Sequence, residues 1–316
     1  MSMNQSVLIC DQVAPILNDI LQKNGLKVSY EPEITAEQIK EKIGNFDIVI
    51  VRSRTKITKE MIDKASKCKL IARVGVGLDN IDTDAATAKG IRVINAVEGA
   101  MNAVAELVLG LMLSLAREIP RADRKIREGG WPKKDLMGIE LSGKYLGIVG
   151  LGNIGKKLAR HARALNMNII GYDVIPIPDD FTREVGLVKT DIDTLLSSAD
   201  FISFHVPLTE STYHLVNKEK LSKMKKTAYL INTSRGEIID EAALLQALKE
   251  RKIAGAALDV REKEPDPSSD TAVGSELTQL PNVISTPHIG AQTKEAQVLA
   301  ANVIAEKIIM ILRGVI

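Results

Sequence analysis

Residues 145–155, YLGIVGLGNIG, join an apolar run to three glycines in the spacing Gly150-x-Gly152-x-x-Gly155. An apolar strand before such glycines and a helix directly after them are typical of a dinucleotide-binding turn. The first glycine allows the tight turn, the second lets the backbone approach a pyrophosphate, and the third lets helix and strand pack closely. The alternative is that the glycines serve only a tight turn.

A carboxylate follows this motif at the distance that nucleotide binding needs. Asp173 ends the next apolar run, NIIGYD, 18 residues after Gly155. An acidic residue about 20 residues after the glycines can accept hydrogen bonds from an adenosine ribose. The same charge would repel a 2′-phosphate, and no arginine follows directly, so the sequence favours NAD over NADP.

Strand and helix patterns alternate on both sides of the motif. Before it, apolar runs such as 47–52 and 70–74 alternate with helical stretches, and a near-continuously apolar helix follows at 101–117. From residue 145 onward, six further apolar runs alternate with helices, and a long amphipathic helix comes last. Strands and helices that alternate without hairpin turns predict parallel sheets. We expect an α/β protein with two doubly wound parallel-sheet domains, one flavodoxin-like and one of the Rossmann type.

Composition excludes several classes of function. The 316 residues are 45% hydrophobic and 26% charged. The net charge of +2 is too small to indicate binding to nucleic acid or acidic membranes. Cys10 and Cys68 fit no metal-ligand or disulfide spacing, so we expect no metal and a cytoplasmic protein with reduced thiols. We see no signal peptide. The apolar stretch 104–116 is shorter than the about 20 residues of a membrane helix, so we expect it inside the protein or against a partner subunit.

Three stretches place reactive side chains after strands of the second series. Arg235 lies in NTSRG, Asp259 and Glu264 lie in ALDVREKEP, and His288 lies in STPHIGAQ. Ligands of such sheets bind beyond the carboxyl ends of the strands, so these side chains should converge. An arginine can hold a carboxylate, a histidine can carry a hydroxyl proton, and a carboxylate beside it raises its pKa. The set predicts oxidation of a 2-hydroxy acid, although His288 alone would suit a loop role.

Motifs along nearly the whole chain follow the order of one family. They are VRSRTKIT, ARVGVGLDNID, GLGNIG, GYD, NTSRG, ALDVREKEP and PHIGAQT. On these motifs the chain resembles the D-isomer-specific 2-hydroxyacid dehydrogenases, and within them most the phosphoglycerate dehydrogenases. The resemblance implies that Arg235 binds the substrate carboxylate and carbonyl, and that Glu264 pairs with His288, the acid/base.

The resemblance also implies NAD as the cofactor and a set of residues that line its site. At Val76 and Val206 threonine is often seen in the family, and each valine would lose a hydroxyl contact with the cofactor. The residues expected at the NAD site are Val76, Gly150, Gly152, Asn153, Ile154, Gly155, Asp173, Val206, Pro207, Thr233, Ser234, Arg235, Asp259, His288, Gly290 and Ala291.

The family further implies a division of the chain. Residues 1–98 with 288–316 would form the substrate-binding domain, and 99–287 the NAD-binding domain, with closure between them. Residues from about 99 to 140 resemble the dimerisation segment, so we expect a homodimer. The C-terminal regulatory domain of longer relatives, and serine feedback through it, is not expected.

The basic stretch VRSRTK, residues 51–56, bears on the identity of the substrate. A positive cluster at a strand end suits a phosphate, which favours 3-phosphoglycerate. The resemblance then implies a step of serine biosynthesis. The alternative is that these basic residues face solvent or form ion pairs. The residues expected at the substrate site are Arg52, Ser53, Arg54, Val76, Gly77, Arg235 and His288.

Two rival functions stay open. A glyoxylate or hydroxypyruvate reductase, or a D-lactate-type dehydrogenase, would use the same mechanism on a smaller acid. A dinucleotide-sensing binding protein, such as the transcriptional corepressors of this fold, would bind NADH without significant turnover, and the Arg–Glu–His set does not exclude it.

Overall fold

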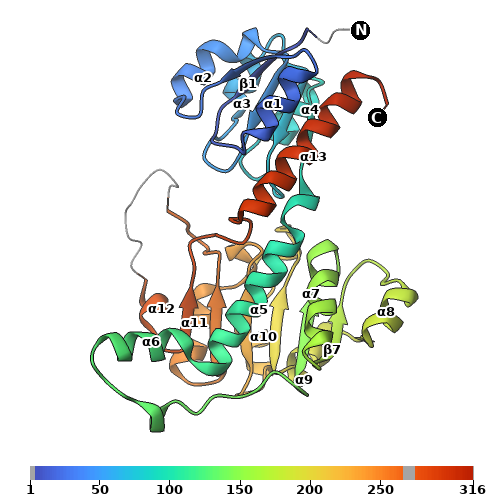
Figure 1. Ribbon diagram of the computed structural model, residues 1–316. Coiled ribbons are helices and arrows are strands. Elements are labelled where there is room, and N and C mark those ends of the chain that lie inside the picture. Colours follow the sequence, from blue (N-terminus) through green and yellow to red (C-terminus); the bar gives the residue numbers. More distant parts are fainter. Residues whose placement is uncertain (1–3, 266–274, 316) are drawn as a thin grey trace. The chain divides into compact units, whose positions relative to one another are not determined.

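The computed structural model describes residues 4–265 and 275–315 (Figure 1). The chain forms two compact units. The first contains residues 4–101 and 291–315, and the second contains residues 102–265 and 275–290. Each unit has its own parallel sheet with helices on both faces, as the alternation of strands and helices predicts.

The first unit contains a five-stranded parallel sheet in the order β2-β1-β3-β4-β5, which is the flavodoxin-like order. Its strands are β1 (Ser6–Ile9), β2 (Lys27–Tyr30), β3 (Ile48–Val51), β4 (Leu70–Arg73) and β5 (Arg92–Asn95). Its helices and 3-10 turns are α1 (Ile16–Lys23), α2 (Ala36–Lys42), η1 (Ile43–Asn45), α3 (Lys59–Lys64), α4 (Thr83–Ala88), η2 (Val97–Ala100) and α13 (Lys294–Leu312).

Alternate residues of these strands face two separate cores. Val7 and Ile9 of β1 pack with α1 and α13, whereas Leu8 packs with α2, α3 and α4 on the opposite face. Because both faces are covered, a strand such as β3 is apolar and buried at every residue. Figure 1 shows α13, in red, beside α1, in blue, although they come from opposite ends of the chain.

The second unit contains a seven-stranded parallel sheet in the order β12-β11-β10-β9-β6-β7-β8. From β8 inward this is the Rossmann order, with its reversal between β6 and β9. The strands are β6 (Tyr145–Val149), β7 (Asn168–Tyr172), β8 (Val188–Lys189), β9 (Phe201–Phe204), β10 (Tyr229–Asn232), β11 (Gly255–Leu258) and β12 (Val283–Ser285). The helices and 3-10 turns are α5 (Met101–Arg117), α6 (Ile119–Arg127), η3 (Lys133–Asp135), α7 (Asn153–Ala164), α8 (Asp179–Val185), α9 (Ile192–Ser198), α10 (Lys218–Lys223), η4 (Gly236–Ile238), α11 (Glu241–Lys249) and α12 (Glu276–Gln279).

Helix α5 corrects one expectation from the sequence. With turn η2 it forms a run of 20 residues, Val97–Ala116, that is long and apolar enough to cross a membrane by length and composition. Length therefore does not exclude a membrane span, but burial favours a core helix, because Ala105, Val108 and Met112 lie in the core of the second unit. The helix is not buried all round, since Leu113 is 42% exposed.

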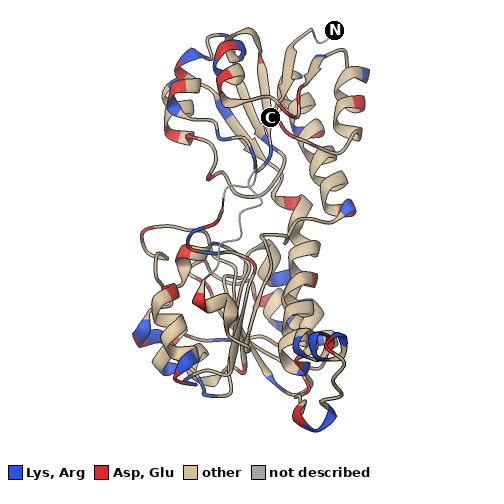
Figure 2. Ribbon diagram, turned by 90° about the vertical axis from the view of Figure 1, so that its left-hand side faces the viewer, with Lys and Arg blue, Asp and Glu red and all other residues tan. Residues whose placement is uncertain are grey.

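Charged side chains of both signs are interspersed on the helices drawn in Figure 2. Several of them pair one helical turn apart, as Lys59 does with Asp63 and Arg127 with Asp123. Exposed pairs of this kind contribute little to stability because water and salt screen them. The small net charge therefore arises from mixed charges rather than from a lack of them.

Candidate active site

The glycine turn joins β6 to α7. Gly150 has a φ of +94°, a conformation that side chains other than glycine rarely adopt. A Cβ on Gly155 would lie 2.1 Å from the carbonyl oxygen of Gly150, so the helix touches the turn. A Cβ on Gly152 would meet nothing within 4 Å, which leaves open space beside the helix start at Asn153 and Ile154. This space and the helix N–H groups fit a pyrophosphate.

Asp173 follows β7 and faces the glycine turn. Its Oδ2 accepts a hydrogen bond from the backbone N–H of Leu151 at 2.6 Å, and its Oδ1 accepts one from Ile175 at 2.9 Å. Each carboxylate oxygen keeps a lone pair that can accept from a ribose hydroxyl. Val174 and Ile175 are 84% and 70% exposed, so an apolar surface lies next to this carboxylate. The arrangement fits the adenosine half of NAD.

The turn after β10 holds a polar atom without a partner. Thr233 Oγ1 is buried and makes no hydrogen bond, whereas Ser234 Oγ donates to the carbonyl oxygen of Phe204. A buried hydroxyl without a partner costs free energy, so Thr233 Oγ1 suits a contact with a bound ligand. Val206 and Pro207 lie shortly after the end of the neighbouring strand β9, and the side chain of Val206 lies close to Gly150.

His288 is fixed by its backbone and by one carboxylate. It adopts a left-handed conformation with a φ of +54°, and its N–H donates to the carbonyl oxygen of Asp259 at 2.8 Å. Its Nδ1 lies 2.9 Å from Glu264 Oε2. The ring is 48% exposed, so Nε2 is the nitrogen that a substrate can reach.

The charges around His288 raise its pKa. The hydrogen bond that the ring donates to Glu264 raises the pKa most, while desolvation and the charge of Arg235 lower it. Burial raises the pKa of Glu264, but the hydrogen bond and charge of His288 outweigh burial, and the net pKa of Glu264 is lowered. Both shifts favour the imidazolium–carboxylate pair. Such a pair can donate a proton from Nε2 and take it back.

Asp259 anchors the loop that carries His288. It is 1% exposed, and its carboxylate accepts hydrogen bonds from Thr286 Oγ1 at 2.6 Å and from the N–H groups of Ile289 and Gly290 at 2.9 Å each. Burial raises the pKa of Asp259, and these hydrogen bonds oppose the rise. Both carboxylate oxygens of Asp259, which the sequence predicts at the NAD site, therefore accept hydrogen bonds from protein groups.

Arg235 follows β10, and its Nη1 donates to the carbonyl oxygen of Ser234 at 2.6 Å. Its charge lowers the pKa values of both Glu264 and His288. Arg235, Glu264 and His288 thus come together in the second unit, after the neighbouring strands β10, β11 and β12, as the sequence predicts.

Arg54, from the basic stretch of the first unit, forms an internal network. Its Nε donates to Asp11 Oδ1 at 3.1 Å, and its other nitrogens donate to the carbonyl oxygens of Pro32 at 2.7 Å and Ile34 at 3.2 Å. Asp11 is 2% exposed and also accepts from Thr55 Oγ1 at 2.6 Å. These contacts fit the ion-pair alternative that the sequence left open for Arg54.

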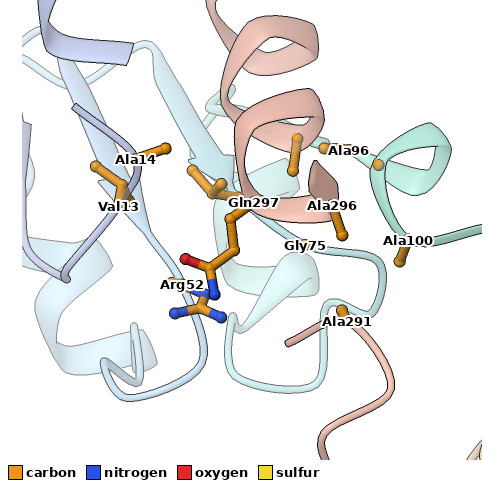
Figure 3. Close-up of a pocket in the computed structure, with 12 residues that line it drawn as sticks. Val13, Ala14, Arg52, Gly75, Ala96, Ala100, Ala291, Ala296 and Gln297 are labelled. Atoms are coloured by element: carbon orange, nitrogen blue, oxygen red, sulfur yellow. The ribbon is translucent and has the colours of Figure 1, made fainter. Parts of the chain in front are cut away.

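Arg52 has a different environment. Its Nη2 donates to Gln292 Oε1 at 2.8 Å, and Figure 3 shows its guanidinium beside the amide end of Gln297. Desolvation lowers the pKa of Arg52. Ser53, the next residue, is exposed. Arg52 lines a small pocket of the first unit together with Val13, Ala14, Gly75, Ala291 and Gln297.

Arg73 is a candidate that sequence reasoning missed. It ends β4, and the parallel register places it opposite Val51, so Arg52 and Arg73 lie at the same edge of the first sheet. Arg73 Nη1 donates to the carbonyl oxygen of Gly77, and Asn95 Nδ2 donates to that of Val76. The available signal was an arginine that ends the strand next to VRSRTK.

Comparisons with known proteins agree with this arrangement. Residues 109–290 match the family model described as "D-isomer specific 2-hydroxyacid dehydrogenase, NAD binding domain". A D-3-phosphoglycerate dehydrogenase of Methanocaldococcus jannaschii is 47% identical over 98% of this chain, but the chain spans only 57% of that relative. A hydroxypyruvate reductase of Thermotoga maritima is 44% identical over 92% of this chain and 96% of its own.

A solved structure gives the same result. The D-lactate dehydrogenase of Aquifex aeolicus, complexed with NAD and lactic acid, superposes with a TM-score of 0.84 at 29% identity, over 98% of this chain and 96% of that chain. The chain belongs to the D-isomer specific 2-hydroxyacid dehydrogenase family, and it contains the NAD-binding domain of that family.

Proposed function

We propose that this protein is an NAD-dependent D-3-phosphoglycerate dehydrogenase, which interconverts 3-phosphoglycerate and 3-phosphohydroxypyruvate. The observation that carries the chemistry is the 2.9 Å contact between His288 Nδ1 and Glu264 Oε2, with Arg235 after the neighbouring strand. Relatives named D-3-phosphoglycerate dehydrogenase, 39–47% identical over 98% of the chain, support the choice of substrate.

The side chains of this site divide the chemistry among them. NAD, when bound, supplies the hydride acceptor or donor. Arg235 binds the carboxylate and the reacting oxygen of the acid with its guanidinium. In oxidation His288 Nε2 takes the hydroxyl proton, and in reduction it returns that proton to the developing alkoxide. Glu264 stabilises the imidazolium and keeps the ring oriented.

For the substrate phosphate we favour Arg52 and Arg73 over Arg54. Arg52 and Arg73 lie at the carboxyl ends of paired strands in the first sheet, and Arg54 forms an ion pair with the buried carboxylate of Asp11. Arginine suits a phosphate because its planar fork can donate two parallel hydrogen bonds. We expect Arg52→Met to lower kcat/KM for a phosphorylated acid more than for glyoxylate. Equal losses of kcat/KM with the two acids would contradict the assignment of Arg52 to the substrate phosphate.

A hydroxypyruvate reductase is the second candidate, because the Thermotoga maritima relative of that name matches this chain almost end to end. The deciding experiment follows NADH consumption with 3-phosphohydroxypyruvate, hydroxypyruvate and glyoxylate in parallel. A strong preference for the phosphorylated acid supports the proposal, and a preference for the small acids supports the reductase. NADH binding without turnover of any acid would indicate a dinucleotide sensor.

We also propose a cytoplasmic homodimer. The segment from α5 through residue 137 leaves apolar side chains on the surface, which supports a contact with a second copy of the chain. Among them are Leu113 (42% exposed), Ile119 (50%), Ile126 (48%), Trp131 (81%) and Met137 (89%). Cys10 and Cys68 are free and buried, which suits a reducing compartment. Light scattering on the purified protein would test the dimer, and a monomer mass would contradict it.

A further inference from the structure

The loop that carries Glu264 is anchored by an ion pair between Arg261 and Glu241. Arg261 Nε and Nη2 donate to Glu241 Oε1 and Oε2 at 2.7 and 2.8 Å, so the pair is bidentate. The two side chains are only 14% and 20% exposed. Glu241 Oε1 also accepts from the N–H of Glu262 at 2.9 Å. The first residue of α11 therefore holds the backbone two residues before Glu264.

Further contacts attach the same loop to the turn that carries Arg235. A Cβ on Gly236 would lie 1.9 Å from the carbonyl carbon of Arg261, so the two backbones touch with no room for a side chain. The N–H of Arg261 lies 3.4 Å from Glu264 Oε1, and Arg261 Nη2 also donates to Ser275 Oγ at 2.9 Å. Arg261 thus connects α11, the start of α12 and the carboxylate of Glu264.

We infer that Arg261 and Glu241 are a positioning pair, which holds Glu264 against His288. Neither residue is assigned a contact with the reacting atoms, so their effect acts through Glu264. Glu264 needs such support because its side chain is 39% exposed and water competes for its oxygens. The inference rests on the proposed function and names a residue pair on which the acid/base geometry depends.

The effect should be visible in the titration of His288. The charged groups of the second unit that act on His288 are Glu264, Asp259 and Arg235. Arg261 and Glu241 hold the backbone of the loop that carries Glu264, so the loss of this pair should change the titration of His288 through the position of Glu264. Because Glu264 raises the pKa of His288, a displaced Glu264 would let that pKa fall.

The kinetic test compares Arg261→Met and Arg261→Lys with Arg160→Met. Arg160 makes a bidentate pair with Glu184 at 2.5 and 2.8 Å elsewhere in the second unit, so it is the control for the loss of a bidentate arginine, although its pair is more exposed. We expect Arg261→Met to lower kcat/KM for 2-oxo acid reduction about 10- to 100-fold, as displacements of about 1 Å do. The alkaline limb of its pH profile should move to lower pH. Arg261→Lys should lie between, and Arg160→Met should match the parent.

A second measurement does not depend on turnover. The chain contains four histidines, and ¹³C-labelled rings can be titrated by NMR, with His288 assigned by its loss in His288→Gln. We expect a lower midpoint for His288 in Arg261→Met than in the parent protein. An unchanged midpoint, or an equal shift in Arg160→Met, would overturn the inference even if the enzyme is active. Arg261→Lys supplies the same comparison if Arg261→Met does not fold.

Discussion

The glycines of the β6–α7 turn allow one prediction that separates cofactor binding from folding. Alanine at position 152 would point its methyl group into open space, since no atom lies within 4 Å of a Cβ there. The φ of −72° at Gly152 is one that alanine adopts, and the ψ of −155° lies about 25° past the edge of the β region, so alanine would need a small backbone adjustment. We therefore expect Gly152→Ala to fold with a loss of stability under about 1 kcal/mol, the scale of an N-cap change.

Alanine at position 155 has no such room. Its Cβ would lie 2.1 Å from Gly150 O, and ordinary contact begins at 3.4 Å, so turn and helix must separate by roughly 1.3 Å. Overpacking of this kind costs about 1–3 kcal/mol. For a unit of this size, each kcal/mol lowers the melting temperature by about 2–4 °C, so we expect a fall of roughly 2–12 °C.

The assays are thermal unfolding and NADH fluorescence titration. The methyl group of Gly152→Ala would occupy the space where a pyrophosphate approaches α7, so NADH affinity should fall at least about tenfold, or about 1.4 kcal/mol. Gly155→Ala should lose affinity and thermal stability together. Parent-like NADH affinity in Gly152→Ala would refute the pyrophosphate site, and a parent-like melting temperature in Gly155→Ala would refute the packing argument.

Three further predictions concern single carboxylates. Glu264→Gln removes the largest cause that raises the pKa of His288. Because reduction needs the protonated ring, the alkaline limb of the pH profile of kcat/KM for reduction should move to lower pH. An unmoved limb would count against the pair. Asp173→Ala should weaken NADH binding about 10- to 100-fold, because hydrogen bonds to charged groups contribute about 1.5–3 kcal/mol. It should also reduce the preference for NADH over NADPH. Unchanged affinities for both cofactors would disprove the role of Asp173. Asp11→Ala removes the buried partner of Arg54 at a cost of about 3 kcal/mol in the free energy of unfolding. Calorimetry should therefore show a melting temperature roughly 10 °C lower. A fall of less than about 2 °C would contradict the internal network.

Much of this site could be predicted from the sequence because its signals are local. The glycine spacing specifies a turn, and the strands before Arg235, Asp259 and His288 are apolar runs of recognisable length. Parallel strands end at one edge of a sheet, so residues far apart in sequence can be expected to meet. The short edge strand β8, Val188–Lys189, escaped detection because two residues carry no periodicity.

Other features depend on tertiary pairing that composition does not encode. VRSRTK contains two arginines of equal sequence character, yet Arg54 turns toward Asp11 whereas Arg52 lines a pocket with Gln297. The bidentate pair of Arg261 with Glu241 likewise joins residues 20 positions apart. An ion pair becomes visible only when the fold brings its partners together.

We propose that His288 transfers the proton and that NAD binding does not depend on its side chain. The most direct measurement compares turnover and NADH binding of His288→Gln with those of the parent protein. Loss of a general acid costs about 10²–10⁴ in rate, so we expect turnover of 3-phosphohydroxypyruvate to fall by that factor while NADH affinity changes little. Undiminished turnover would contradict the proton-transfer role, and a parallel loss of NADH binding would make His288 a structural residue.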